Sequence, residues 1–327
     1  GRMEFSSELL ALSGAVELTT DDSLFLHADS LLWARDVGEF WIPDRMEMRV
    51  PGGQVGGRNM KADLQLGAWS LEQTRETWWT GGDSLSVTAG RQTGRRNSGQ
   101  IVVDYEDLTA TFDGLTMQGE RALYLEERGL LQFDAGVRAV DSTHSFRSGR
   151  MEYNLREQSF AATGEVSLLA DSVEITASAF SHRAGTESFL GTPAEFRRGE
   201  RTIGGSELSY DRTSGILRAR EAVSFREGNK NLTSDRLIYH RETDSVAVEG
   251  SFSLNIPAMQ GVAAGGGLQY SVRGGRATMT RRPTFRRERG DGSQLLISAR
   301  TIGANLHDET LDCGGFFRAA SKEAVIT

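Results

Sequence analysis

Apolar and polar residues alternate along several stretches of this 327-residue chain. The clearest stretch is residues 245–256, SVAVEGSFSLNI. Its even-numbered positions are apolar except at Gly250, and its odd-numbered positions are mostly polar. A period of two is typical of a β-strand with one dry face. The same parity predicts strands within residues 131–139, 173–179 and 217–225. No apolar stripe of helical period is long enough to indicate a helix, so we expect an almost entirely β fold.

Two parts of the chain have similar sequences in the same order. GRMEF at residues 1–5 returns as GRMEY at residues 149–153, and VGGRNMKAD at residues 55–63 corresponds to IGGSELSYD at residues 203–211. Matches that keep their order indicate an internal duplication, and about 150 residues are enough for one domain. We therefore predict two copies of one unit, residues 1–148 and 149–327, with Phe5 equivalent to Tyr153 and Gly57 equivalent to Gly205.

A shorter period lies within the predicted copies. A phrase of the type small-x-x-aliphatic-x-aromatic ends at Tyr124, Tyr153, Tyr210, Tyr239 and Tyr270. A polar turn such as HRETDS follows, and then another alternating strand begins. Turn signals at strand-length spacing predict hairpins that lie side by side. Since each hairpin buries one face only, we expect a stack in which neighbours and a facing layer complete the core.

Composition narrows the classes of function. A net charge of −8 argues against general nucleic-acid binding. The five histidines are scattered without paired spacing, which predicts no metal site. Phosphate-loop, nucleophile-elbow and Cys–His motifs are missing from the sequence, so we expect a protein that is no enzyme and uses no cofactor. The single cysteine, Cys313, is expected to be a small core residue.

Two long stretches, residues 27–71 and 191–250, resemble the OstA-like periplasmic domains of the lipopolysaccharide-transport bridge, LptA and especially LptC. The similarity lies in a phrase of the type AxxLxY, a polar turn, a GxVxF phrase and a return strand. The resemblance implies an open β-jellyroll, a trough of two antiparallel sheets whose apolar interior shields lipid acyl chains. It also implies a periplasmic location and head-to-tail joining of such domains by strand pairing. The fold expected here is thus all-β, with two tandem jellyroll units that form one elongated trough.

The chain departs from the family pattern, because a family member usually has one jellyroll and a membrane anchor. The sequence has no run of 18 or more apolar residues. Because the chain starts on a repeat boundary, we hypothesise that a signal or anchor before Gly1 has been cut away. Membrane contact would then come only through partners or through that missing anchor.

The apolar parity residues are the candidates for the lining of the trough. An alternating strand more often packs an ordinary sandwich core, and both interpretations remain open for this set. The candidate lipid-binding residues are Val246, Val248, Phe252, Leu254, Ile256, Val223, Phe225, Leu131 and Phe133.

An arginine-rich stretch, residues 272–292, contains seven arginines and two acidic residues. Arginine binds phosphate through two parallel hydrogen bonds, so the stretch is a candidate for contact with anionic groups. The simpler interpretation, which we favour, is a solvated hairpin with protective charges at a sheet edge. The candidate anion contacts are Arg281, Arg282, Arg286 and Arg287.

These patterns favour a lipid-shielding bridge or adaptor that carries lipopolysaccharide or a related glycolipid. We expect it to join other OstA-like proteins end to end, through unpaired strands such as Phe316–Thr327, where Lys322 and Glu323 limit unspecific association. One alternative is a structural scaffold that binds partner proteins and no lipid. Another is a β-solenoid that binds or cleaves carbohydrate, and cleavage would need two carboxylates about 5 to 10 Å apart in one groove.

Overall fold

The computed structural model describes the whole chain except residues 7, 20–24, 64–65, 81–82, 98–99, 171, 184–187, 212, 289–292, 322–324 and 327. Strands make up 81% of the described residues, which also contain two single-turn 3-10 helices and no α-helix. All the strand pairs that follow are antiparallel. The prediction of an almost entirely β fold is therefore confirmed.

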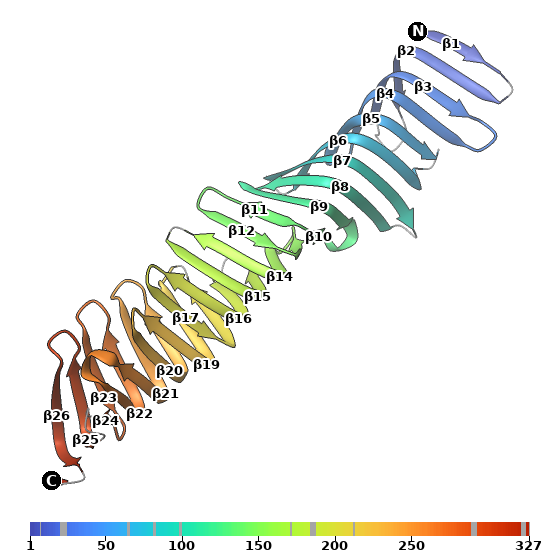
Figure 1. The fold of residues 1–327 in the computed structure, drawn as a ribbon. Helices are drawn as coiled ribbons and strands as arrows, with labels where there is room; N and C mark the ends of the chain where they lie inside the picture. The colour runs from blue at the N-terminus through green and yellow to red at the C-terminus, as the bar shows by residue number, and fades with distance from the viewer. Residues whose placement is uncertain are drawn as a thin grey trace. The chain divides into compact units, whose positions relative to one another are not determined.

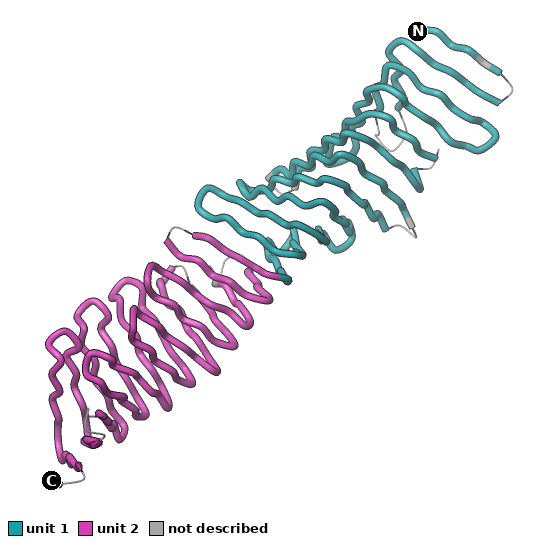
Figure 2. The backbone as a smooth tube through the Cα atoms, viewed as in Figure 1, with its two compact units in different colours: residues 1–164 teal, residues 165–327 magenta. Residues whose placement is uncertain are grey.

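The chain divides into two compact units, which we call unit 1 (Gly1–Gly164) and unit 2 (Glu165–Thr327) (Figure 2). The strands of unit 1 are β1 (Arg2–Phe5), β2 (Leu9–Thr19), β3 (Phe25–Ala34), β4 (Glu39–Val50), β5 (Gly53–Asp63), β6 (Ala68–Thr80), β7 (Asp83–Asn97), β8 (Gln100–Phe112), β9 (Leu115–Leu125), β10 (Leu130–Ala135), β11 (Val137–Val140), β12 (His144–Ser148) and β13 (Arg150–Asn154). The 3-10 helix η1 (Glu126–Arg128) lies between β9 and β10.

Strand β14 (Ser159–Ala170) contains the last residues of unit 1 and the first of unit 2. The other strands of unit 2 are β15 (Val173–Arg183), β16 (Ser188–Arg198), β17 (Arg201–Gly205), β18 (Glu207–Asp211), β19 (Ile216–Glu227), β20 (Lys230–His240), β21 (Ser245–Ile256), β22 (Gly261–Ser271), β23 (Arg276–Thr280), β24 (Thr284–Glu288), β25 (Gln294–Asn305), β26 (Thr310–Ala320) and β27 (Val325–Ile326). The 3-10 helix η2 (Pro257–Met259) precedes β22. Figure 1 shows successive strands side by side in each unit.

The long strands bend near their middle. In β21 the pairing register with β20 and β22 shifts just after Glu249, and Gly250 there has a φ of 97°. This left-handed conformation suits glycine, which has no Cβ to clash, and the gap that Gly250 leaves in the apolar parity thus marks a bulge. Strand β19 shifts register between Arg220 and Val223. Each bent strand therefore contributes one part to each of two halves of one hydrogen-bonded sheet.

In unit 2 we call these two halves of the sheet wall A and wall B. Wall A includes residues 207–211, 216–220, 236–240, 245–249, 267–271, 276–280 and 302–305. Wall B consists of residues 194–198, 201–205, 223–227, 230–234, 252–256, 261–264 and 284–288. The edge where strands pass from one wall to the other is the corner, and the opposite edge, formed by the turns, is the mouth.

Aromatic side chains from the two walls meet in the core of unit 2. Phe196 of wall B packs against Tyr210 and Tyr239 of wall A, with ring centroids 5.9 and 6.1 Å apart. Phe225 of wall B packs edge to face against Tyr270 of wall A at 6.3 Å. These contacts show that the buried faces of the walls face each other, as in a β-sandwich.

The hairpins that begin with GRMEF and GRMEY have the same register. Arg2 pairs with Ser13 in β1–β2, and Arg150 pairs with Thr163 in β13–β14. Phe5 pairs with Leu10, and Tyr153 pairs with Phe160. The match concerns these hairpins alone, so the duplication of residues 1–148 as residues 149–327 stays a prediction.

Candidate functional site

The candidate lining residues all lie on the buried face of their strands. Val246 and Val248 are in wall A, whereas Phe252, Leu254, Ile256, Val223 and Phe225 are in wall B. Leu131 and Phe133 lie on β10 in unit 1. Each of these nine side chains is at most 4% exposed. The structure thus brings the seven residues of unit 2 into one apolar interior, which is filled by protein side chains.

A group of charged and phenolic side chains joins the two walls at the mouth of unit 2. Arg201, in the first position of β17 in wall B, forms an ion pair with Asp244, in the wall A turn between β20 and β21. The Tyr239 hydroxyl donates to Asp244 Oδ1 at 3.0 Å. Arg198 Nη1 donates to the Tyr239 hydroxyl at 3.2 Å. This part of the mouth is closed by bonds between side chains of opposite walls.

A second set of bonds closes the mouth further along the unit. The Tyr270 hydroxyl, on wall A, donates to Glu227 Oε2 on wall B at 2.6 Å. Lys230 Nζ donates to both Glu227 Oε2 and the Tyr270 hydroxyl, each at 3.1 Å. Arg201 Nε also donates to Glu227 Oε1 at 3.2 Å, which joins the two sets. We call these side chains the mouth network: Arg198, Arg201, Glu227, Lys230, Tyr239, Asp244 and Tyr270.

The mouth network changes the acidity of its members. Burial, and then the hydrogen bond and charge of Glu227, raise the pKa of Tyr270 well above the ordinary tyrosine value. Burial and the hydrogen bond to Asp244 raise the pKa of Tyr239. For Arg201, burial lowers the pKa, but the charge of Asp244 and the Tyr239 hydroxyl outweigh burial, so its pKa is raised. The tyrosines are therefore neutral donors and the arginine is a fixed cation at neutral pH.

Unit 1 contains a buried polar cluster of a different kind. Glu76 on β6 is 2% exposed and accepts hydrogen bonds at Oε2 from Trp78 Nε1 at 2.8 Å and from the Tyr105 hydroxyl at 3.1 Å. Burial raises the pKa of Glu76, and the hydrogen bonds from Trp78, Tyr105 and Gln92 oppose that shift. Gln92 Oε1 is buried without a hydrogen-bond partner. The carboxyl group thus lies deep in the interior with donors around it.

The four candidate anion-binding arginines are exposed. Arg281 and Arg282 lie between β23 and β24 and have φ values of 60° and 63°. Arg286 and Arg287 lie on β24 and pair with Val262 and Gly261 of β22. Residues 289–292, which end the arginine-rich stretch, lie outside the described residues. The four arginines stay candidates for contact with anionic groups on the outer surface.

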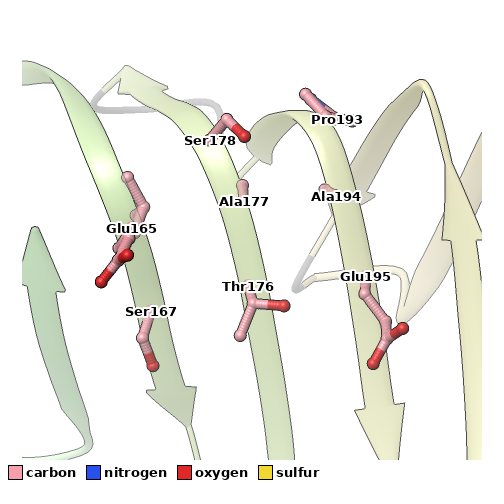
Figure 3. A pocket seen from close by; sticks show the side chains of 9 residues that line it. Glu165, Ser167, Thr176, Ala177, Ser178, Pro193, Ala194 and Glu195 are labelled. Atoms are coloured by element: carbon pink, nitrogen blue, oxygen red, sulfur yellow. The ribbon is translucent and has the colours of Figure 1, made fainter.

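An open cleft of about 470 Å³ lies on unit 2, where β14, β15 and β16 run side by side (Figure 3). Carboxylates of β14 and β16 and hydroxyls of β14 and β15 line it, and the picture shows no cation or aromatic ring among the labelled side chains. The lining residues include no His, Lys or Cys that could act as a nucleophile or base beside the hydroxyls. The lining residues are Glu165, Val166, Ser167, Thr176, Ala177, Ser178, Pro193, Ala194 and Glu195.

In the described ranges, His, Cys, Asp and Glu side chains do not gather in threes or more as metal ligands. Likewise, none of the described helices has the length and apolar character to cross a membrane.

Cys313 is exposed on β26, so the expectation that it is a core residue was wrong. Strand β26 has no buried residue among those described, which explains the exposure.

No protein-family model and no curated protein matches the sequence. Among solved structures, the chain is similar to the crystal structure of LptH, described as the LptA homologous periplasmic component of the lipopolysaccharide transport device from Pseudomonas aeruginosa. The two sequences are 10% identical, the match covers 44% of this chain and 82% of the LptH chain, and the TM-score is 0.20. At these values the likeness supports no statement about this chain.

Sequence reasoning found the tyrosines of the mouth network but missed their partners. The recurring aromatic positions include Tyr239 and Tyr270, and the polar turn HRETDS contains Asp244. The partner Glu227 lies 43 residues before Tyr270. The partners could have been sought among the charged residues at the strand ends one hairpin before each tyrosine. Such residues are also common at solvated turns, so the pattern did not single them out.

Proposed function

We propose that the chain is a periplasmic bridge or adaptor that shields the acyl chains of lipopolysaccharide or a related glycolipid on the way to the outer membrane. The observation that carries the proposal is the continuous apolar interior between two walls of bent antiparallel strands. The cargo and the location follow from the resemblance of residues 27–71 and 191–250 to the OstA-like domains. Such a role is non-enzymatic, because shape and dryness are enough to hold a hydrocarbon chain.

Burial of hydrocarbon provides the driving force. Each methylene transferred from water into an apolar interior contributes about 0.8 kcal/mol. Part of this gain is offset when side chains such as Phe225, now packed against Tyr270 of wall A, and the buried Phe252 give way to the ligand. The present burial of these side chains also supports the alternative, a scaffold that binds partner proteins and no lipid.

The proposal includes partners that join the chain end to end. In β26, residues 310–314 and 317–320 pair with β25, and of the described residues only Ala319 and Ala320 also pair with β27. Phe316 on this strand is 99% exposed. A strand with unpaired backbone groups and an exposed aromatic residue is a template for a strand of another domain.

Photo-crosslinking in the native envelope tests the lipid function. We would replace Phe252, which is buried on wall B, by p-benzoylphenylalanine, and use the same replacement of its exposed neighbour Ser253 as the matched control. We expect a glycolipid adduct from position 252 and none from position 253. Adducts with protein alone at position 252, together with native mass spectrometry that detects no copurified lipid, would favour the scaffold.

A further inference from the structure

The two edges of unit 2 hold the walls together in different ways. At the corner, the backbone of each long strand passes from one wall to the other, as in β19, β20 and β21. At the mouth, the described bonds between the walls join side chains: Arg201 to Asp244, and Tyr270 to both Glu227 and Lys230. Side-chain bonds break without disturbing strand pairing, so the mouth is the edge that can separate reversibly.

The wall A turns form a row that can move together. Arg241 N donates to Gly215 O at 3.0 Å, Val272 N donates to Asp244 O at 3.0 Å, and Leu306 N donates to Gly275 O at 2.7 Å. Each bond joins the backbone of one turn to the backbone of the preceding one. A separation at the mouth would therefore displace neighbouring turns as a group.

The interior side chains behind the mouth network are shielded from solvent in the closed arrangement. Phe225, Tyr239 and Tyr270 are each at most 2% exposed, so an acyl chain cannot contact them while the mouth network is intact. The corner offers no path, because the strands are continuous there. The mouth runs along the side of the unit and is lined by charged groups. A hydrocarbon chain cannot form the hydrogen bonds that these groups make with one another.

We propose that the mouth of unit 2 is the entry site for an acyl chain, and that the mouth network is the reversible closure of that site. The chain enters sideways when the bonds of Tyr270 and Arg201 to the opposite wall break, and the bonds form again around it. The identity of what enters rests on the proposed lipid-shielding function. The opening of the mouth does not depend on that function.

Tyr210 provides a matched control for Tyr270. Its hydroxyl accepts a hydrogen bond from Arg241 Nη1 at 3.1 Å, but Tyr210 and Arg241 both belong to wall A and its turns. Both tyrosines are buried, at 6% and 2% exposure. Replacement by phenylalanine removes one phenolic hydroxyl in each case. Only Tyr270→Phe removes a bond between the walls.

The first experiment measures access to the interior of the full chain. In a Cys313→Ser background, Ala277→Cys places a thiol on wall A beside Tyr270, its strand partner. The rate of alkylation by N-ethylmaleimide under native conditions then reports opening, and urea unfolding reports global stability. We expect Tyr270→Phe to increase the rate roughly tenfold, as loss of a hydrogen bond to a charged group allows, and Tyr210→Phe to leave it unchanged.

The proposal is overturned if Tyr270→Phe and Tyr210→Phe increase the rate equally, or if the rate follows only the loss of global stability. If Tyr270→Phe does not fold, Glu227→Gln serves instead, because it keeps the side-chain shape and removes the charged acceptor. A faster rate in that variant supports the closure, and an unchanged rate contradicts it.

The second experiment separates this inference from the proposed function. The probe is 11-(dansylamino)undecanoic acid, whose fluorescence rises in an apolar site. Faster uptake by Tyr270→Phe than by Tyr210→Phe supports entry at the mouth. Uptake at one rate by all variants overturns the entry site and leaves lipid shielding intact. Faster alkylation without any probe binding overturns acyl-chain entry and the lipid function together, while the mouth still opens.

Discussion

The tyrosines of unit 2 each have two separate tasks. The rings of Tyr239 and Tyr270 pack in the core against Phe196 and Phe225, while their hydroxyls bond to carboxylates at the mouth. An aromatic residue with a polar tip suits a position where one end is dry and the other reaches charged groups. Phenylalanine would preserve the packing and lose the connection between the walls.

The raised pKa of Tyr270 predicts a loss of stability in alkaline solution. Above about pH 10, the ordinary tyrosine value, an unfolded chain releases the phenolic proton while the folded chain retains it. The stabilising contribution is thus fully present below that pH and decreases as the pH rises. We expect urea denaturation at pH 8 and pH 11 to show a smaller loss for Tyr270→Phe than for the original protein. Equal losses would contradict this.

The buried carboxyl of Glu76 predicts a stabilising substitution. Its pKa is raised by burial, so its charged form at neutral pH makes folding less favourable, and protonation at lower pH relieves this. In Glu76→Gln, the amide oxygen can accept from Trp78 and Tyr105 as Oε2 does now, and the amide nitrogen can donate to a neighbouring acceptor such as Gln92 Oε1.

We expect Glu76→Gln to increase the free energy of unfolding by about 1 kcal/mol at pH 7 and by less at pH 4. Glu76→Ala is the control, since it removes the acceptor and leaves Trp78 and Tyr105 without their partner. Thermal and urea unfolding at the two pH values measure both effects. A Glu76→Gln protein less stable than the original at pH 7 would show that the carboxylate bonds outweigh the cost of burial.

At the scale of the strand, alternation decides which substitutions are tolerated. In β21, Phe252 is 4% exposed and its neighbour Ser253 is exposed. Phe252→Asp places a charge without a partner between the walls, and we expect it to lower the free energy of unfolding by several kcal/mol. Ser253→Asp should change it by less than about 0.5 kcal/mol. Urea denaturation of both variants checks the assignment of faces, which comparable losses would refute.

The alternation of apolar and polar residues in β21 and β19 was visible in the sequence, because successive side chains of a strand point to opposite faces. A facing layer was expected, but the positions where the strands bend were not visible, because the bulges follow from pairing register, as at Arg220–Val223. The mouth network was also beyond reach, since it joins Arg201 to Asp244 across 43 residues. Periodicity predicts what one strand buries, but not what the opposite wall places against it.

At the scale of the whole molecule, the outer strand β26 is the proposed contact with another domain. We expect Phe316→Asp to weaken association with candidate bridge partners, because a charge on an exposed edge strand discourages pairing. Leu190→Asp is the control: Leu190 is 39% exposed on β16, a strand paired on both sides. Light scattering over a concentration series measures association, and equal effects of the two variants would remove β26 from the proposal.

The predicted role of Phe316–Thr327 has a second test. Lys322 and Glu323 lie outside the described residues, but Val325 and Ile326 pair with Ala320 and Ala319 as β27. Deletion of residues 323–327 should weaken end-to-end association more than folding. Unchanged association of the shortened chain, with its unfolding transition intact, would exclude this segment as a contact.

Pairing in unit 2 joins strands that are neighbours in sequence or nearly so, as from β19 through β20 and β21 to β22. The length of such a stack is therefore a variable that evolution can alter without redesigning the core. Insertion of one bent hairpin would add two strands at about 4.8 Å each, and the new turns could continue the row of backbone bonds from turn to turn. A longer or shorter stack could then be made by changing the number of hairpins, while each hairpin keeps the same strand pairing and the same bonds between turns.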